Sequence, residues 1–186
     1  MSILAAEPNL FPETLFDRAS EASDEDACWW VMYCLARQEK QLMRRLRALE
    51  VAHYCPLIAK RNRSPSGRIR TSYIPLFSGY TFVFGSNQDR YAAVATGCVS
   101  RCLEVADGAL LRHDLQQIQE LIALGRPLTP EARLLAGDRV RVGSGPFRGF
   151  EGVIIRRQNK TRLLVAVNYL QQGASMLLDD CQLEPL

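Results

Sequence analysis

The chain has 186 residues and a formal net charge of +3, a length that allows one domain or two small ones and excludes a large multidomain enzyme. Apolar residues make up 47% and charged residues 23%, which is typical of globular chains and argues against a disordered or fibrous protein. The charge is uneven, because residues 1–27 hold one cation and seven carboxylates, a net of −6, and the rest of the chain is +9.

The N-terminal third predicts an acidic arm, a strand and a helix. Residues 1–27 lack a sustained apolar period, so we expect a mobile arm. Residues 29–35 form an apolar, aromatic and β-branched run that is typical of a buried central strand. An amphipathic helix with a basic flank is predicted over residues 37–51, since leucines recur there at four and three residues. These core-facing leucines are Leu42, Leu46 and Leu49.

A basic hairpin is expected next. Residues 53–58 read as a strand, and the turn-forming residues around Gly67 predict a protruding hairpin over residues 59–74. Five cations fall within eleven residues of this segment, and no Asp or Glu occurs between Glu50 and Asp89. Such a block favours a polyanionic partner.

The middle of the chain alternates strands and helices. Residues 80–84 and 98–105 predict strands on either side of a short helix over residues 88–96. A further helix follows, with Asp114 as its expected N-cap and Gly125 as its stop. Prolines then predict a linker over residues 125–136.

The last fifty residues change character. Short β-branched runs alternate with glycines from residue 137 onward, which favours a small closed antiparallel barrel. Closure would remove the edges that so small a sheet cannot otherwise protect.

Two segments together resemble the NusG family of transcription elongation factors. Residues 29–34 (WWVMYC) and 75–84 (PLFSGYTFVF) look like the N-terminal NGN domain of that family, and residues 137–154 look like its KOW motif. The opening strand and the Pro-Leu-Phe stretch look closer to RfaH-type specialised members, although Ser78 stands where the family usually has Pro. The KOW motif residues are Gly145, Phe147, Gly149 and Gly152.

This resemblance implies an α+β protein in two modules. An acidic arm (1–27) would precede an NGN-like domain of an antiparallel sheet flanked by helices (28–124), and the linker (125–136) would lead to an SH3-like β-barrel KOW domain (137–186). β-branched runs favour strands in the second module over the helical hairpin known from RfaH.

The resemblance also implies partners and sites. NusG proteins grip the clamp helices of the largest RNA polymerase subunit through an apolar pocket, for which Tyr33, Phe77 and Tyr80 are the matching candidates; ordinary core aromatics are the alternative. Contact with non-template or upstream DNA is expected from cations on the helix and the hairpin, because arginine's planar fork suits phosphate. These candidates are Lys40, Arg44, Arg45, Arg61, Arg63, Arg68 and Arg70.

In the KOW module, Tyr169 and Leu170 match the positions through which the family recruits Rho or a small-subunit ribosomal protein, and barrel core is the alternative for both. We expect a monomer. The acidic arm could screen the basic hairpin in cis or serve only for solubility.

Enzymatic and membrane functions are not indicated. No run of eighteen apolar residues and no secretory signal pattern occurs, and the six cysteines form no CxxC pair, so we expect a cytoplasmic protein with reduced thiols. His53 lies beside an apolar run and His113 at an expected helix start, and no metal or catalytic spacing is found. We therefore expect a non-enzyme without catalytic residues, metal or cofactor. The leading hypothesis is a NusG-like elongation and antitermination factor; the alternative is a KOW-containing RNA- or ribosome-binding protein that acts away from polymerase.

Overall fold

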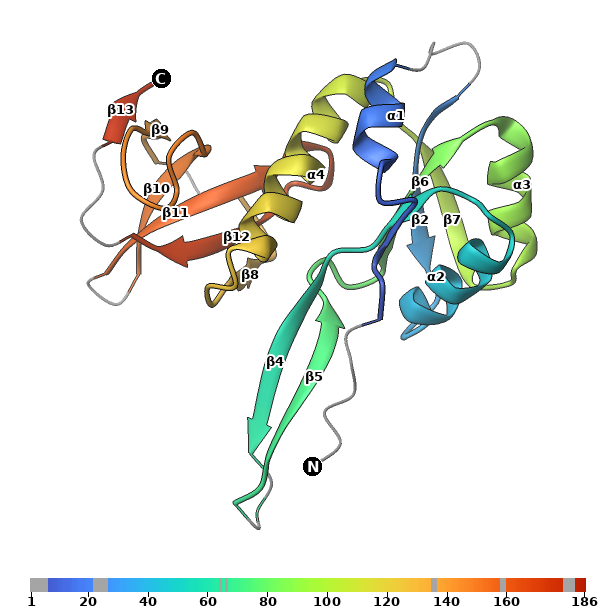
Figure 1. Cartoon of the computed structure of the whole chain (residues 1–186), viewed down its shortest axis with the longest axis horizontal. Helices are drawn as coiled ribbons and strands as arrows, with labels where there is room; N and C mark the ends of the chain where they lie inside the picture. Colours follow the sequence, from blue (N-terminus) through green and yellow to red (C-terminus); the bar gives the residue numbers. More distant parts are fainter. Residues whose placement is uncertain are drawn as a thin grey trace. The chain divides into compact units, whose positions relative to one another are not determined.

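The computed structural model describes residues 7–21, 27–63, 65, 67–134, 137–157, 160–178 and 183–186. The chain divides into two compact units, Met1–Ala109 and Leu110–Leu186 (Figure 1). The first unit contains several helices and strands, and the second contains a sheet and most of one long helix. The predicted mixed α+β class is therefore confirmed.

The first unit is built on a five-stranded antiparallel sheet in the order β1-β3-β6-β2-β7. Its strands are β1 (Leu10–Phe11), β2 (Cys28–Cys34), β3 (His53–Tyr54), β6 (Tyr80–Gly85) and β7 (Val99–Glu104). The central position predicted for the first apolar run is confirmed, because β2 pairs with β6 on one side and β7 on the other.

Both faces of β2 are covered, which explains its unbroken apolar sequence. On one face, Trp30 and Met32 join Leu42 and Leu46 of α2 (Glu39–Ala48) in a core cluster that also includes Ala93 of α3 (Asn87–Ala95). The leucine face of α2 is therefore confirmed at two positions. The third, Leu49, lies just past the end of α2 and is 52% exposed.

The N-terminal residues differ from the expected mobile arm. Leu10 and Phe11 form β1 on the edge of β3, and α1 (Leu15–Glu21) buries Leu15 and Phe16. The Phe16 ring lies 5.5 Å from that of Tyr54 and 6.2 Å from that of Trp29. The expectation was wrong for these residues because apolar side chains, closely spaced within an acidic segment, cover the second face of the sheet; the acidic run 24–26 lies outside the described residues.

The predicted hairpin is confirmed as a two-stranded sheet of β4 (Leu57–Arg63) and β5 (Ile69–Pro75). Figure 1 shows it extending away from the five-stranded sheet. Gly67, near its tip, has φ of +77°, which favours glycine; Ser64 and Ser66 lie outside the described residues.

The second unit holds most of helix α4 (Gly108–Ala123) and a six-stranded antiparallel sheet in the order β13-β9-β10-β11-β12-β8. The bounds are β8 (Thr129–Glu131), β9 (Arg139–Val142), β10 (Glu151–Arg157), β11 (Lys160–Val167), β12 (Gln172–Leu177) and β13 (Leu183–Pro185), with a 3-10 helix η1 (Asn168–Leu170) between β11 and β12.

Three expectations for this part are corrected. Among the described residues β13 and β8 end the sheet without pairing with each other, so the closed barrel is not observed. The segment expected to be only a linker supplies β8, which pairs with the free edge of β12. Helix α4 begins at Gly108, so Asp114 lies inside it and not at its N-cap. The expected stop at Gly125 is confirmed, since α4 ends at Ala123 and Gly125 has φ of +66°.

The division between the units also falls earlier in the chain than the expected linker. It lies between Ala109 and Leu110, which groups most of α4 with the C-terminal sheet instead of with the NGN-like domain. Polar contacts from α4 to that sheet, described below, are consistent with this grouping.

Candidate functional site

Two of the three predicted pocket aromatics form a pair on the surface of the first unit. Tyr33 of β2 lies opposite Tyr80 of β6, with ring centroids 5.2 Å apart, and Tyr33 is 41% exposed while Tyr80 is half-buried. A Cβ at Gly79, where φ is +85°, would lie 3.1 Å from the Tyr33 ring. The glycine therefore lets the tyrosine ring lie close over the turn before β6.

A hollow of about 400 Å³ opens beside Tyr33. Its lining includes Leu35, which is 47% exposed, Arg37 and Glu39. Glu39 is buried, and its carboxylate accepts a 2.7 Å hydrogen bond from the Gly79 backbone N–H. Sequence reasoning missed these three residues; Leu35 could have been found as the apolar residue that follows the buried strand.

The third predicted aromatic, Phe77, is not part of this surface. It is 1% exposed and its ring packs edge-on against Phe82, with centroids 6.3 Å apart. Phe77 is a core residue, so a partner cannot contact its side chain without opening the fold.

The predicted cations of α2 differ in their surroundings. Arg44 is exposed and forms two hydrogen bonds with the Glu7 carboxylate, from Nε to Oε2 at 2.8 Å and from Nη2 to Oε1 at 2.7 Å. The Arg44 hydrogen bond is the main reason why the pKa of Glu7 lies below its ordinary value. Arg45 donates to the Thr96 carbonyl oxygen, and Lys40 is half-buried.

Arg47, which was not among the predicted nucleic-acid-binding residues, also contacts the N-terminal segment. Its guanidinium lies 5.5 Å from the centroid of the Phe11 ring and donates to the Leu10 carbonyl oxygen at 3.2 Å. The N-terminal residues thus contact two of the arginines of α2.

The hairpin presents cations on both of its faces. In the register of β4 and β5, Arg63 is opposite Ile69 and Arg61 is opposite Thr71, so these side chains share one face. Asn62 is opposite Arg70 on the other face. The four predicted arginines of the hairpin are all exposed, and Ile69 near the tip is 66% exposed.

Packing joins the hairpin to the basic helix. At the base of the hairpin, Leu57 and Cys55 form a cluster with Met43 of α2, against which Tyr73 packs. The structure therefore anchors the hairpin and the cationic helix to each other within the first unit.

The KOW-like residues of the second unit form the loop between β9 and β10. Gly145 and Gly149 have φ of +81° and +92°, and Phe147 between them is buried. A Cβ at Gly152 would overlap the Leu164 carbonyl oxygen of β11, so only glycine fits there without a shift. The predicted strand, glycine loop and strand are confirmed.

The predicted partner-binding residues lie in η1. Tyr169 is 38% exposed and Leu170 is half-buried. The preceding Asn168 is held by Asp114 of α4, whose buried carboxylate accepts from the Asn168 backbone N–H at 2.8 Å and from its side-chain amide at 3.1 Å. These bonds explain why an acidic residue is buried inside α4.

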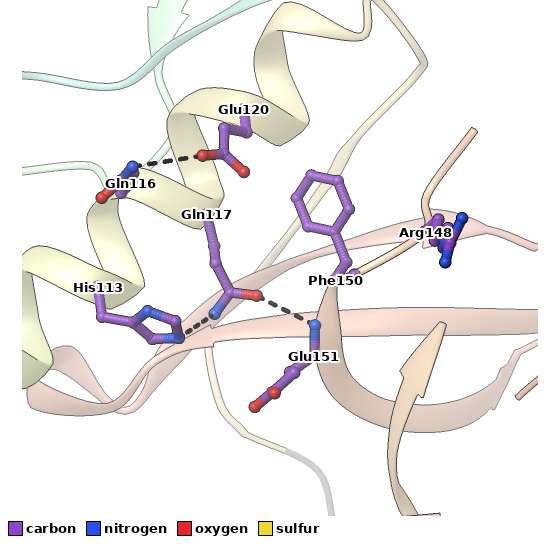
Figure 2. A pocket seen from close by; sticks show the side chains of 8 residues that line it. His113, Gln116, Gln117, Glu120, Arg148, Phe150 and Glu151 are labelled. Atoms are coloured by element: carbon purple, nitrogen blue, oxygen red, sulfur yellow. Dashed lines mark hydrogen bonds between the residues drawn. The ribbon is translucent and has the colours of Figure 1, made fainter. Parts of the chain in front are cut away.

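A polar cleft of about 280 Å³ lies between α4 and the β9–β10 loop (Figure 2). Gln117 bridges it, because its Oε1 accepts from the Glu151 backbone N–H at 3.1 Å and its Nε2 lies 3.2 Å from Nε2 of His113. Arg148 and Phe150 come from the facing loop. Of the site residues predicted from the sequence, only Gly149 of the KOW motif lines this cleft.

His53 and the thiols of Cys34 and Cys55 are buried in the core of the first unit. His53 is buried, with Nδ1 2.8 Å from the Val51 carbonyl oxygen, and burial lowers its pKa. Burial raises the pKa of Cys34 to about 11 and that of Cys55 to about 12. In the described part of the chain, five cysteines are free, no three His, Cys, Asp or Glu residues gather as a metal site would require, and no helix is long and apolar enough to cross a membrane.

Comparison with known proteins gives one family. Residues 27–119 match the model of the NusG family, described as "Transcription termination factor nusG". No curated protein sequence matches the chain. Among 17 matching chains of solved structures is one described as "Crystal Structure of MjSpt4:Spt5 complex conformation B", at 16% identity over 85% of this chain and 97% of that chain, with a TM-score of 0.26.

Proposed function

The chain belongs to the NusG family, whose model matches residues 27–119, half of its 186 residues, and we propose that it binds RNA polymerase and promotes processive elongation and antitermination. It acts as a binding factor and not as an enzyme, as a monomer in the cytoplasm. The observation that carries this proposal is the Tyr33–Tyr80 pair within the matched segment, in which Tyr33 is exposed.

The polymerase contact is assigned to the surface around Tyr33. An exposed tyrosine beside an exposed leucine and a hollow offers apolar area that a helical partner can cover, and the resemblance points to the clamp helices of the largest subunit. Leu35 joins Tyr33 and Tyr80 in this role, whereas Phe77 is buried against Phe82 and takes no part in the contact.

The hairpin is assigned the role of binding nucleic acid. Its arginines are exposed on both faces, which suits contact with phosphates of non-template or upstream DNA beside the bound polymerase. Since the hairpin is anchored to α2, we assign the cations of both elements to the nucleic-acid contact.

The second unit is proposed to act as a KOW domain that recruits a further partner, Rho or a small-subunit ribosomal protein. The glycine loop between β9 and β10 and the exposed Tyr169 support this assignment. An RfaH-type specialised role is proposed on the opening strand and the Pro-Leu-Phe stretch alone.

The test is binding to purified RNA polymerase by the full chain and two single variants. Tyr33→Ala is expected to weaken binding at least tenfold, because an aromatic at the centre of an interface commonly contributes this much. Tyr91→Ala is the matched control, since Tyr91 is 64% exposed in α3 and away from the hollow, and it is expected to bind as the unchanged protein does.

Absence of binding by the intact chain, or equal binding by the two variants, contradicts the proposal. If the intact chain ignores polymerase but binds RNA or ribosomes, the alternative function as a KOW-containing RNA- or ribosome-binding protein replaces it.

A further inference from the structure

The Glu7 carboxylate occupies the guanidinium fork of Arg44 in the way that a phosphate group would. Both carboxylate oxygens are engaged, one by Nε at 2.8 Å and one by Nη2 at 2.7 Å. Arginine binds carboxylate and phosphate through the same pair of parallel hydrogen bonds. Glu7 therefore marks a place where two phosphate oxygens can be held.

The charge of a second cation acts on the same carboxylate. The positive charges of Arg44 and Lys40 both contribute to the lowered pKa of Glu7, after the hydrogen bond from Arg44. Arg44 and Lys40 lie one helical turn apart in α2, so their side chains share a face. An anion bound by Arg44 is therefore also attracted by the charge of Lys40, as a backbone phosphate of nucleic acid is on a basic helix.

The segment that carries Glu7 is anchored close by. The Asn9 carbonyl oxygen accepts from the Cys55 backbone N–H at 2.8 Å, and β1 continues with Phe11 stacked on His53 at 6.0 Å between centroids. Glu7 lies only two residues before the first of these contacts. The short tether keeps the carboxylate at a high local concentration beside Arg44.

The ion pair itself is exchangeable. The Arg44 and Glu7 side chains are 65% and 33% exposed, and exposed ion pairs contribute little and are screened by salt. A polyanion that brings several phosphates at once can displace one carboxylate without detaching β1.

We propose that Arg44 and Lys40 form a phosphate-binding position for the nucleic-acid backbone, which Glu7 occupies in the free protein and leaves when nucleic acid binds. The N-terminal segment thus weakens non-specific binding of nucleic acid and favours binding where polymerase holds the DNA in place. This inference rests on the nucleic-acid contact of the proposed function and not on the polymerase contact.

The experiment measures the affinity of the full chain for a short duplex DNA at low salt. Glu7→Gln removes the charge that competes with phosphate, and Glu13→Gln is the matched control because Glu13 is an exposed carboxylate of the same segment and its loss changes the net charge equally. We expect Glu7→Gln to bind up to about fivefold more tightly than Glu13→Gln, the range set by exposed ion pairs.

The same comparison in an Arg44→Gln background isolates the contact. There, Glu7→Gln and Glu13→Gln are expected to bind DNA equally, since the position that Glu7 occupies has been removed. Equal affinities of the two variants in the unchanged background would overturn the inference, as would an advantage of Glu7→Gln that persists without Arg44. No duplex binding by any variant would also overturn it, while polymerase binding by the same protein would leave the rest of the proposed function standing.

Discussion

The salt dependence of DNA binding offers a quantitative test of the hairpin. We consider the triple variant Arg61→Gln, Arg63→Gln and Arg70→Gln, which neutralises exposed side chains on both faces of β4 and β5. Each phosphate contact contributes about 0.9 to the slope of log affinity against log salt, so three contacts contribute about 2.7. Over a fourfold increase, from about 50 to 200 mM salt, the unchanged protein should therefore lose about 40-fold more affinity than the triple variant.

The assay is a fluorescence anisotropy titration of a labelled duplex at several salt concentrations. The control neutralises three exposed arginines elsewhere and gives the same net charge: Arg101→Gln, Arg126→Gln and Arg133→Gln. The control is expected to keep the slope of the unchanged protein. A slope that the hairpin variant leaves unaltered, or one that both triples lower equally, would refute a specific role of the hairpin and leave only the net charge as the cause.

Three further outcomes follow from buried groups. Phe77→Ala should lower the free energy of unfolding by about 3–5 kcal/mol in a denaturant titration, so any loss of polymerase binding should track loss of folded protein. The native thiols of Cys34 and Cys55, with pKa values of about 11 and 12, should resist alkylation at pH 8. These thiols stay protonated in the folded protein at a pH where the unfolded chain ionises them, so the free energy of unfolding should fall as the pH rises above the ordinary thiol pKa of 9.0. Denaturant titrations at several pH values can measure this fall. Asp114→Ala should speed hydrogen exchange of the Asn168 backbone amide about tenfold or more, because a hydrogen bond to a charged acceptor is lost. An unchanged exchange rate would show that the conformation of η1 does not depend on Asp114.

The sequence by itself determined most of the secondary structure of the first unit. The apolar run at residues 29–35, the alternation at 80–84 and the turn chemistry near Gly67 each predicted an element that the structure contains. These patterns are local, because side-chain direction repeats every two residues in a strand and every 3.6 in a helix. The glycine loop between β9 and β10 was predicted for the same reason.

Only the tertiary structure decided which of these residues are available to a partner. Tyr33 and Phe77 are both aromatic residues of motif segments, yet one is 41% exposed and the other 1%, since exposure depends on what the rest of the chain covers. The composition of residues 10–21 predicted part of an acidic arm, but their few apolar side chains pack against the second face of the sheet.

The pairing of Glu7 with Arg44 shows most directly why the sequence alone could not predict the candidate binding positions. The two residues are 37 positions apart, and no periodic pattern relates them. Their contact exists because β1 pairs with the edge of β3 and brings the N-terminal segment to α2. The contact of Asn168 with Asp114, 54 residues away, likewise depends on the packing of α4. Local periodicity specifies which elements form, whereas contacts between distant residues, and with them the candidate binding positions, arise only when those elements pack.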